Sequence, residues 1–386
     1  GRAAARNRAI TLVAGRARHD RGVQRDGGRA DCEYDVPRSC VRNERRGDGV
    51  RREPELRDAV RRAGRAGARW PLHVERAVHV FAADAASTTH RRCVPREMTG
   101  AAGGAMEFRY VPRTPAEGFT QGSPEAEEGR DIDESQWQSV ITYAVFVGRN
   151  EVTQGQWKVA TGGTNPACFQ STTLASCTTT NANNAAPVDS VDWWTAAAFA
   201  NWLSEQAGLT RCYAFSPADW DRTTSNWADG DGQNRTPATE VAWADRACPG
   251  YRLPTESEWE WAARGPVASG TMTTAYFFGD AMDGAFAWTN TNAGARSEAA
   301  GGKLPNAYGL RDMIGNMREW VWDWYAVYPV DASTDFAGPT SGTRRISRGG
   351  SWSSSAASSR SAHRSDALPD TRTAFIGLRL ARTVSP

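Results

Sequence analysis

Imidazole groups are scarce in this chain of 386 residues, and their placement limits the available chemistry. Four of the five histidines lie before residue 100, and only His363 lies after it. A Ser–His–Asp triad, or a metal site built from several histidines, needs imidazole at defined places. The sequence therefore argues against both kinds of catalyst in the part of the chain that follows residue 100.

Three alternating glutamates, Glu256, Glu258 and Glu260, invite a reading as paired acid and base catalysts. They also occupy the first turns of a predicted helix, where the helix dipole favours negative charge. We interpret these carboxylates as structural.

Seven cysteines are present, and the last four could close loops as disulfides: Cys168, Cys177, Cys212 and Cys248. Cys168 and Cys177 flank a loop rich in Thr and Ser, and Cys212 and Cys248 flank a long polar insertion. We expect Cys212 to be linked to Cys248, with four buried free thiols as the alternative. Such a set indicates an exported protein, periplasmic, cell-surface or extracellular.

Three helices with marked beginnings must help to position these residues. Their N-terminal residues are Thr153 with Gln156, Asp192 or Ser190, and Thr255 with Glu258; the first and third pairs form capping boxes. The remaining sequence is rich in Trp and Gly and predicts short strands and long loops. We therefore expect an α+β fold with little regular secondary structure.

Charge and aromatic content divide the chain in two. Residues 1–100 hold 23 Arg, no Lys, 13 acidic residues and one Trp, whereas the other 15 Trp lie beyond. Because a core needs large apolar side chains, we expect residues 1–105 to be an Arg-rich disordered or spurious leader and residues 106–384 to be the folded domain. A nucleic-acid-binding arm is the alternative for the leader, but we expect no nucleic-acid partner.

No apolar run is long enough for a transmembrane segment, and we expect a monomer.

Six ordered segments together resemble the formylglycine-generating enzyme and sulfatase-modifying factor family. They are EVTQGQW (151–157), PVDSVDWWTAAAFANWLS (187–204), YRLPTESEWEWAARG (251–265), PNAYGLRDMIGNMREWVWDWY (305–325), RRISRGGSW (344–352) and IGLRLAR (376–382). The resemblance implies a loop-rich variant of the C-type lectin fold. Family members include oxidases that convert a sulfatase cysteine to formylglycine, iron-dependent sulfoxide synthases and non-catalytic binding proteins.

The resemblance also locates the copper site of the oxidases, and this chain departs from it. The two cysteine positions fall at Ser354 and Ser359, and a tryptophan near that site is replaced by Arg318. Ser351 matches a serine that lines the oxygen-side pocket. Because soft thiolates suit Cu(I) and hydroxyls do not, we expect no copper. The scarcity of histidine argues against the iron-dependent branch.

A calcium-binding stretch of the family matches residues 312–319. By position, Asp312 and Glu319 would supply side-chain oxygens, and Gly315 and Met317 would supply backbone carbonyls. Hard cations prefer six to eight oxygen ligands, and a structural calcium ion would stabilise a loop-rich domain. The alternative is that Glu319 makes a structural ion pair with an arginine, and we expect Asn316 to cap the turn.

We therefore predict a sulfatase-modifying-factor-like domain without the copper cysteines, acting as a non-catalytic ligand-binding protein or pseudoenzyme. The candidate ligand-binding residues are Ser351, Trp352, Ser354, Ser359, Arg360, His363, Arg364 and Arg318. One alternative is an oxidase acting on a sulfatase cysteine. Another is a receptor-binding protein diversified by a retroelement, because residues 352–375 lack Asn and are rich in the products of Asn-codon mutagenesis. The ligand itself, whether protein, peptide or small molecule, is not identified by the sequence.

Overall fold

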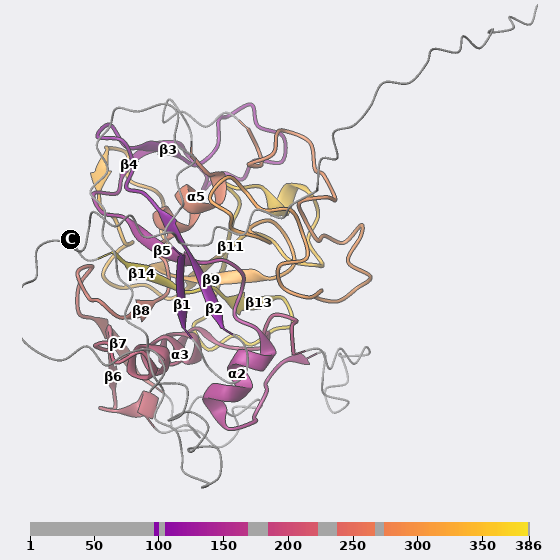
Figure 1. Ribbon diagram of the computed structural model, residues 1–386. Helices are drawn as coiled ribbons and strands as arrows, with labels where there is room; N and C mark the ends of the chain where they lie inside the picture. Colours follow the sequence, from indigo (N-terminus) through magenta and orange to yellow (C-terminus); the bar gives the residue numbers. More distant parts are fainter. Residues whose placement is uncertain (1–95, 100–104, 169–183, 223–237, 267–273, 385–386) are drawn as a thin grey trace, which may run out of the picture. The chain divides into compact units, whose positions relative to one another are not determined.

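The computed structural model (Figure 1) describes residues 96–99, 105–168, 184–222, 238–266 and 274–384. Internal contacts divide the chain into two units, residues 1–70 and 71–386, and every described residue belongs to the second. The predicted leader, residues 1–105, lies almost entirely outside the described residues. Within it, strand β1 (Arg96–Thr99) pairs antiparallel with β2 (Met106–Val111).

The largest sheet has five strands and joins the two ends of the described chain. Its order is β1, β2, β5 (Val145–Gly148), β14 (Ala381–Thr383) and β8 (Tyr251–Arg252). Every neighbouring pair in it is antiparallel. The last strand of the domain is therefore held between segments that come much earlier in the sequence.

A four-stranded sheet carries three of the residues predicted to bind a ligand or metal, Arg318, Glu319 and Arg364. Its order is β12 (Arg364–Ala367), β11 (Arg345–Arg348), β9 (Arg318–Trp324) and β13 (Ile376–Leu378). Strand β9 pairs antiparallel with β11 and parallel with β13. Three tryptophans occupy alternate positions along β9: Trp320 is fully buried, and Trp322 and Trp324 are half-buried.

The other elements are short. A three-stranded sheet contains β3 (Phe119–Gln121), β4 (Trp137–Val140) and β10 (Ser333–Thr334), and a hairpin contains β6 (Tyr213–Ser216) and β7 (Glu240–Trp243). Two 3-10 helices, η3 (Trp220–Arg222) and η4 (Ala357–Ser359), complete the described elements. This inventory of a few helices and many short strands confirms the α+β prediction.

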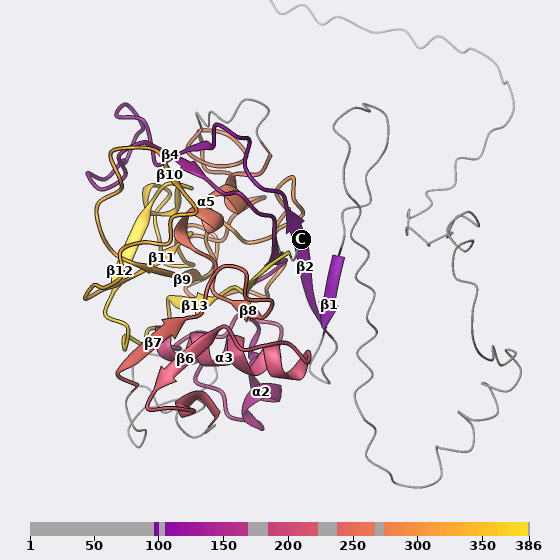
Figure 2. The same ribbon diagram turned by 90° about the vertical axis from the view of Figure 1, so that its left-hand side faces the viewer.

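The three predicted helices begin where their capping residues indicated. They are α2 (Gln154–Thr161), α3 (Trp193–Gln206) and α5 (Glu256–Arg264). Both expected capping boxes are present, and Asp192, rather than Ser190, caps α3 by accepting from the Thr195 N–H at 2.9 Å. Helix α3 packs against β8 and β6, and α5 packs against β9 and β11 (Figure 2).

Tryptophan side chains make up much of the core between these elements. Trp157, Trp193, Trp259 and Trp320 are fully buried, and each such side chain stabilises the fold by roughly 1.5–3 kcal/mol. Two of these indoles donate to backbone carbonyls: the Nε1 of Trp193 donates to the Val321 carbonyl and that of Trp320 donates to the Val191 carbonyl. Strand β9 and the start of α3 are thereby fixed to each other.

Candidate functional site

A polar cavity of about 310 Å³ opens beside the start of β9. The described residues that line it are Arg318, Ser351, Ser353, Ser354, Ser355, Ser358, His363, Ser365 and Phe375. Seven of these nine come from residues 352–375, the segment that follows the Gly-Gly-Ser turn. The structure therefore brings together four of the predicted ligand-binding residues, namely Ser351, Ser354, His363 and Arg318.

Arg318 supplies the positive charge of this cavity. Its side chain is half-buried, and its Nε lies buried without a hydrogen-bond partner. Among the described residues, no carboxylate forms an ion pair with it, and none of those that line the cavity is acidic. Burial without a counter-charge lowers the pKa of Arg318 below its ordinary value, although arginine at neutral pH remains a cation.

The serine hydroxyls form short local hydrogen bonds around a turn. Oγ of Ser354 accepts from the Ser351 N–H at 2.9 Å and lies 3.2 Å from Oγ of Ser351. Oγ of Ser355 in turn accepts from the Ser358 N–H at 3.3 Å. These contacts orient hydroxyl groups that can each still donate or accept a bond toward a ligand.

His363 lines the cavity, and its imidazole has one weak ion-pair partner, Asp131. Its Nε2 lies 3.4 Å from a carboxylate oxygen of Asp131, which is itself largely exposed. Burial lowers the pKa of the His363 imidazole below its ordinary value. At neutral pH the ring is therefore neutral and offers one donor and one acceptor.

Three predicted ligand-binding residues do not reach the cavity. The Ser359 hydroxyl is fully buried and donates to the Ser355 carbonyl at 2.9 Å. Arg360 and Arg364 are also buried, and each guanidinium is held by a carboxylate, Glu134 for the first and Glu256 for the second. The small polar residues that flank Arg360 and Arg364 in the sequence do not indicate that distant glutamates pair with them.

Trp352 has a supporting position beside the cavity. Its indole Nε1 donates to the Ala374 carbonyl at 2.8 Å, and its ring centroid lies 5.1 Å from that of Phe375. Phe375 is the one apolar side chain among the described lining residues. Trp352 therefore fixes the apolar wall of the cavity and does not line it.

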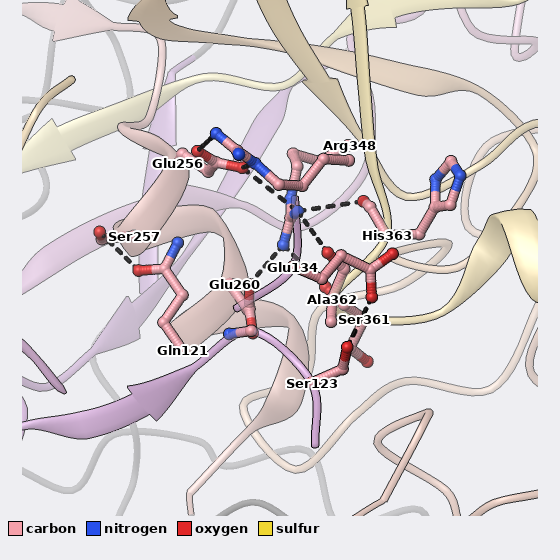
Figure 3. Close-up of polar contacts among 12 residues, drawn as sticks. Gln121, Ser123, Glu134, Glu256, Ser257, Glu260, Arg348, Ser361, Ala362 and His363 are labelled. Carbon is pink, nitrogen blue, oxygen red and sulfur yellow. Dashed lines mark hydrogen bonds and ion pairs between the residues drawn. The ribbon is translucent and has the colours of Figure 1, made fainter. Parts of the chain in front are cut away.

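Buried ion pairs behind the cavity fix the backbone that carries His363 (Figure 3). Arg348 donates to Glu260 at 2.5 Å and to the carbonyls of Ser361, Ala362 and His363 at 2.8–3.0 Å. Glu256 lies 3.2 Å from Arg348 as well. This network holds the turn at 361–363 against helix α5.

The glutamates of α5 form ion pairs within the fold, which agrees with their interpretation as structural residues. Glu256 pairs with Arg364, Glu258 with Arg252, and Glu260 with Arg264 and Arg348. Burial alone would raise the pKa of Glu256 and Glu258, but the adjacent guanidinium groups hold both below the ordinary value. All three carboxylates are therefore buried and paired with arginines.

The donor atoms at the copper position do not fit Cu(I). At the two positions where the resemblance predicts the oxidase thiolates, the side chains are the hydroxyls of Ser354 and Ser359, and the Ser359 hydroxyl donates to a backbone carbonyl. The described cysteines, Cys168, Cys212 and Cys248, are all disulfide-bonded. No described residue near the cavity supplies the soft ligand that Cu(I) requires.

The residues of the predicted calcium site are close together in the fold but already have partners. Asp312 accepts from the backbone N–H groups of Gly301 and Lys303. The Glu319 carboxylate accepts from Arg379 at 2.7–2.9 Å and from the Trp259 Nε1 at 2.7 Å, which matches the alternative of an arginine ion pair. Gly315 adopts a positive φ of 78°, and Met317 is fully buried, so both lie in the tight turn before β9.

Glu151 is an acidic neighbour of this turn that the sequence did not single out as a ligand. It is buried, its Oε2 has no hydrogen-bond partner, and its Oε1 accepts from the Asn316 amide at 3.0 Å. Burial and the nearby charge of Asp312 raise the pKa of Glu151 well above its ordinary value. A cation would stabilise the charged forms of the Glu151 and Asp312 carboxyls, whereas the oxygens of Glu319 are already occupied by hydrogen bonds; within the described residues no set of three His, Cys, Asp or Glu is arranged to hold a metal.

One predicted disulfide is confirmed. Cys212 and Cys248 are bonded across 36 residues of sequence. Cys168 is also disulfide-bonded, whereas Cys177 lies outside the described residues.

No helix in the described ranges is long and apolar enough to cross a membrane.

The cavity also contains residues that the sequence did not single out: Ser353, Ser355, Ser358, Ser365 and Phe375. The sequence indicated these lining residues only through the polar composition of the whole 352–375 segment. Single serines in a polar loop carry no periodicity that separates lining residues from solvent-exposed ones.

Comparison with known proteins agrees with this geometry. The family model of the sulfatase-modifying factor enzyme 1-like domain matches residues 95–384. The bovine formylglycine-generating enzyme is 32% identical over 209 residues, which are 47% of this chain and 56% of that enzyme, so the chain spans little more than half its length. A chaperone protein, LppX of Paenibacillus barcinonensis, is 29% identical over 230 residues, covering 54% of this chain and 70% of LppX.

Among solved structures, Treponema denticola variable protein 1 is similar with a TM-score of 0.59 and 28% sequence identity. The similarity covers 75% of this chain and 99% of the variable protein. The family model and this structure together confirm the fold inferred from the six sequence segments. The chain is a member of the sulfatase-modifying factor enzyme 1-like family.

Proposed function

We propose that this protein is a non-catalytic, ligand-binding member of its family, and that the cavity beside Arg318 is the binding site. The observation that carries the proposal is the donor set at the oxidase position. Hydroxyl groups stand where thiolates would hold copper, and one of them, that of Ser359, is buried against the backbone. A cavity of about 310 Å³ with several hydroxyls, one guanidinium and one aromatic wall has the size and polarity of a small ligand site.

The test is an oxidase assay on the full chain, loaded with Cu(I) and supplied with oxygen and a sulfatase-type peptide containing cysteine. Mass spectrometry would follow conversion of the cysteine to the aldehyde, with the Streptomyces coelicolor formylglycine-generating enzyme as positive control. We expect no conversion by this protein. Conversion would overturn the proposal and favour the oxidase alternative.

A matched variant separates a missing metal ligand from a missing active site. The double substitution Ser354→Cys and Ser359→Cys restores the two sulfur positions and changes one atom in each side chain. Gain of copper binding without turnover would support a site shaped for binding, whereas gain of turnover would mean that only the thiolates had been lost.

A second candidate function is supported by the segment of the sequence that contributes most of the cavity-lining residues. Seven of the nine described lining residues lie in 352–375, the segment whose composition suggested diversification by a retroelement. The similarity to a variable protein of Treponema denticola is consistent with this idea. Sequencing the flanking DNA tests it: a near-copy of the 3′ end beside a reverse transcriptase gene is expected, and absence of both would remove this candidate.

Export and calcium binding belong to the same proposal. The Cys212–Cys248 disulfide supports an oxidising compartment, and the buried, neighbouring carboxyls of Glu151 and Asp312, whose charged forms a cation would stabilise, support a structural cation near the predicted calcium residues. We also propose that the chain acts as a monomer.

A further inference from the structure

The guanidinium of Arg318 differs from the other arginines buried around it. Five buried arginines pair with carboxylates: Arg252, Arg348, Arg360, Arg364 and Arg379. A sixth, Arg345, has no carboxylate partner among the described residues but lies over the rings of Trp193 and Trp324. Arg318 has no such carboxylate among the described residues and lines a cavity, and its Nε is buried and unbonded, as are those of Arg252 and Arg348. A half-buried cation without a counter-charge gains an ion pair when an anion enters the cavity that it lines.

The surroundings of Arg318 are suited to an oxyanion. The described lining contributes six serine hydroxyls and no acidic group, and hydroxyls can donate hydrogen bonds to an anion. Guanidinium groups bind carboxylate, phosphate and sulfate groups through paired N–H donors. A cationic ligand would meet an uncompensated positive charge, and a purely apolar ligand would leave most of the hydroxyls unbonded.

We infer that the cavity binds an oxyanion group of a small ligand, with Arg318 as its counter-charge and the serine hydroxyls of 351–358 as additional donors. This inference rests on the proposed function, because it assigns the class of ligand that the same cavity takes. The neutral imidazole of His363 can add one donor, and Phe375 can contact the apolar part that carries the anion.

Binding of simple anions to the full chain tests the inference. Sodium phosphate, sodium sulfate and sodium acetate would each be titrated by calorimetry in a low-salt Tris buffer, with neutral acetamide as the matched analogue of acetate. We expect at least one anion to bind and acetamide not to bind. Preference for phosphate or sulfate over acetate would identify a tetrahedral oxyanion, and the reverse preference a carboxylate.

Variants assign the binding to this cavity. Arg318→Gln is expected to weaken binding about ten- to a hundredfold, since it removes charge-assisted hydrogen bonds. Arg113→Gln is the matched control, because Arg113 is exposed and does not line the cavity, and it should leave affinity unchanged. Circular dichroism would establish that both variants are folded.

A second pair of variants does not depend on Arg318. Ser353 is exposed at the cavity, so Ser353→Asp adds a negative charge there and Ser353→Asn adds a side chain of the same shape without charge. We expect only the Asp variant to lose anion binding. Equal affinity in Arg318→Gln and the unmodified protein, or equal loss in both Ser353 variants, would overturn the inference.

The outcomes also separate this inference from the proposed function. If no oxyanion binds and the cysteine peptide is not converted, the oxyanion inference fails while a non-catalytic role stands. If the peptide is converted, the proposed function fails whatever the anion titrations give.

Discussion

Replacing Arg318 by methionine should make the protein more stable while it weakens the site. The guanidinium is half-buried, its Nε has no partner, and no described carboxylate neutralises it. An unsatisfied buried polar group costs about 1–3 kcal/mol, and methionine keeps the length and packing of the side chain. Because Arg318 is only half-buried, we expect a gain near the lower end, about 1 kcal/mol, and a rise in Tm of about 2 °C.

The ion pair between Glu319 of β9 and Arg379 provides a control of opposite sign. Glu319 follows Arg318 in β9, and its carboxylate is fully buried and held by Arg379. Arg379→Met would leave that carboxylate buried and unpaired, which typically costs about 3–5 kcal/mol. The two substitutions are chemically identical, so their contrast isolates the effect of having a counter-charge.

Equilibrium unfolding in urea and thermal scans of both variants would measure these changes. The chain has to be compared in an anion-poor buffer, because a bound oxyanion would stabilise the unmodified protein. If Arg318→Met lowers stability by 1 kcal/mol or more in that buffer, Arg318 makes a favourable interaction within the domain. The idea of a cation kept without a partner would then be refuted.

Three further predictions follow from the disulfide, the buried acid and the predicted ion. Replacing Cys212 and Cys248 by serine should cost about 4 kcal/mol for a loop of this length, measured by urea unfolding, and non-reducing peptide mapping should find the two linked. Burial raises the pKa of Asp189 to about 7, above its value in the unfolded chain, so stability should fall as the pH rises from about 4 to 7. Asp189→Asn should remove that part of the pH dependence, and an unchanged profile in urea unfolding would contradict this. Chelation with EGTA should lower the Tm if calcium binds near Asp312, and absence of any shift would end the calcium proposal.

The sequence predicted those parts of the fold that depend on local signals. The capping boxes at Thr153 and Thr255 and the Asp192 cap located three helices, because capping is decided by residues three positions apart. In β9 the tryptophans occur at every second residue, the spacing at which the side chains of a strand share one face. The bonding of Cys212 to Cys248 followed from the length of the polar insertion between them.

The candidate site could be predicted only in part, because the fate of each arginine depends on acidic residues far away in the sequence. Arg360 is neutralised by Glu134, 226 residues before it, and Arg364 by Glu256, 108 residues before it. Nothing in the local sequence distinguishes these two arginines from Arg318, which has no such partner. The number of carboxylates within reach is a property of the tertiary fold and decides which arginine is left for a ligand.

The difference between arginines that pair with glutamates and those that do not also limits which positions of the 352–375 segment can be substituted. If a retroelement diversifies it, sibling copies should vary at exposed or half-buried cavity positions such as Ser353, Ser355 and Ser358, where new side chains meet solvent or ligand. Arg360 should remain constant, because an uncharged replacement leaves Glu134 buried without a counter-charge at a cost of about 3–5 kcal/mol. Arg364 should remain constant as well, because its loss leaves the buried Glu256 with Arg348 as its one ion-pair partner among the described residues. Sequencing such copies from one population would decide the matter. Variation at the two arginines as frequent as at the serines would mean that these ion pairs do not hold the segment, and that the cavity is not built on a fixed frame.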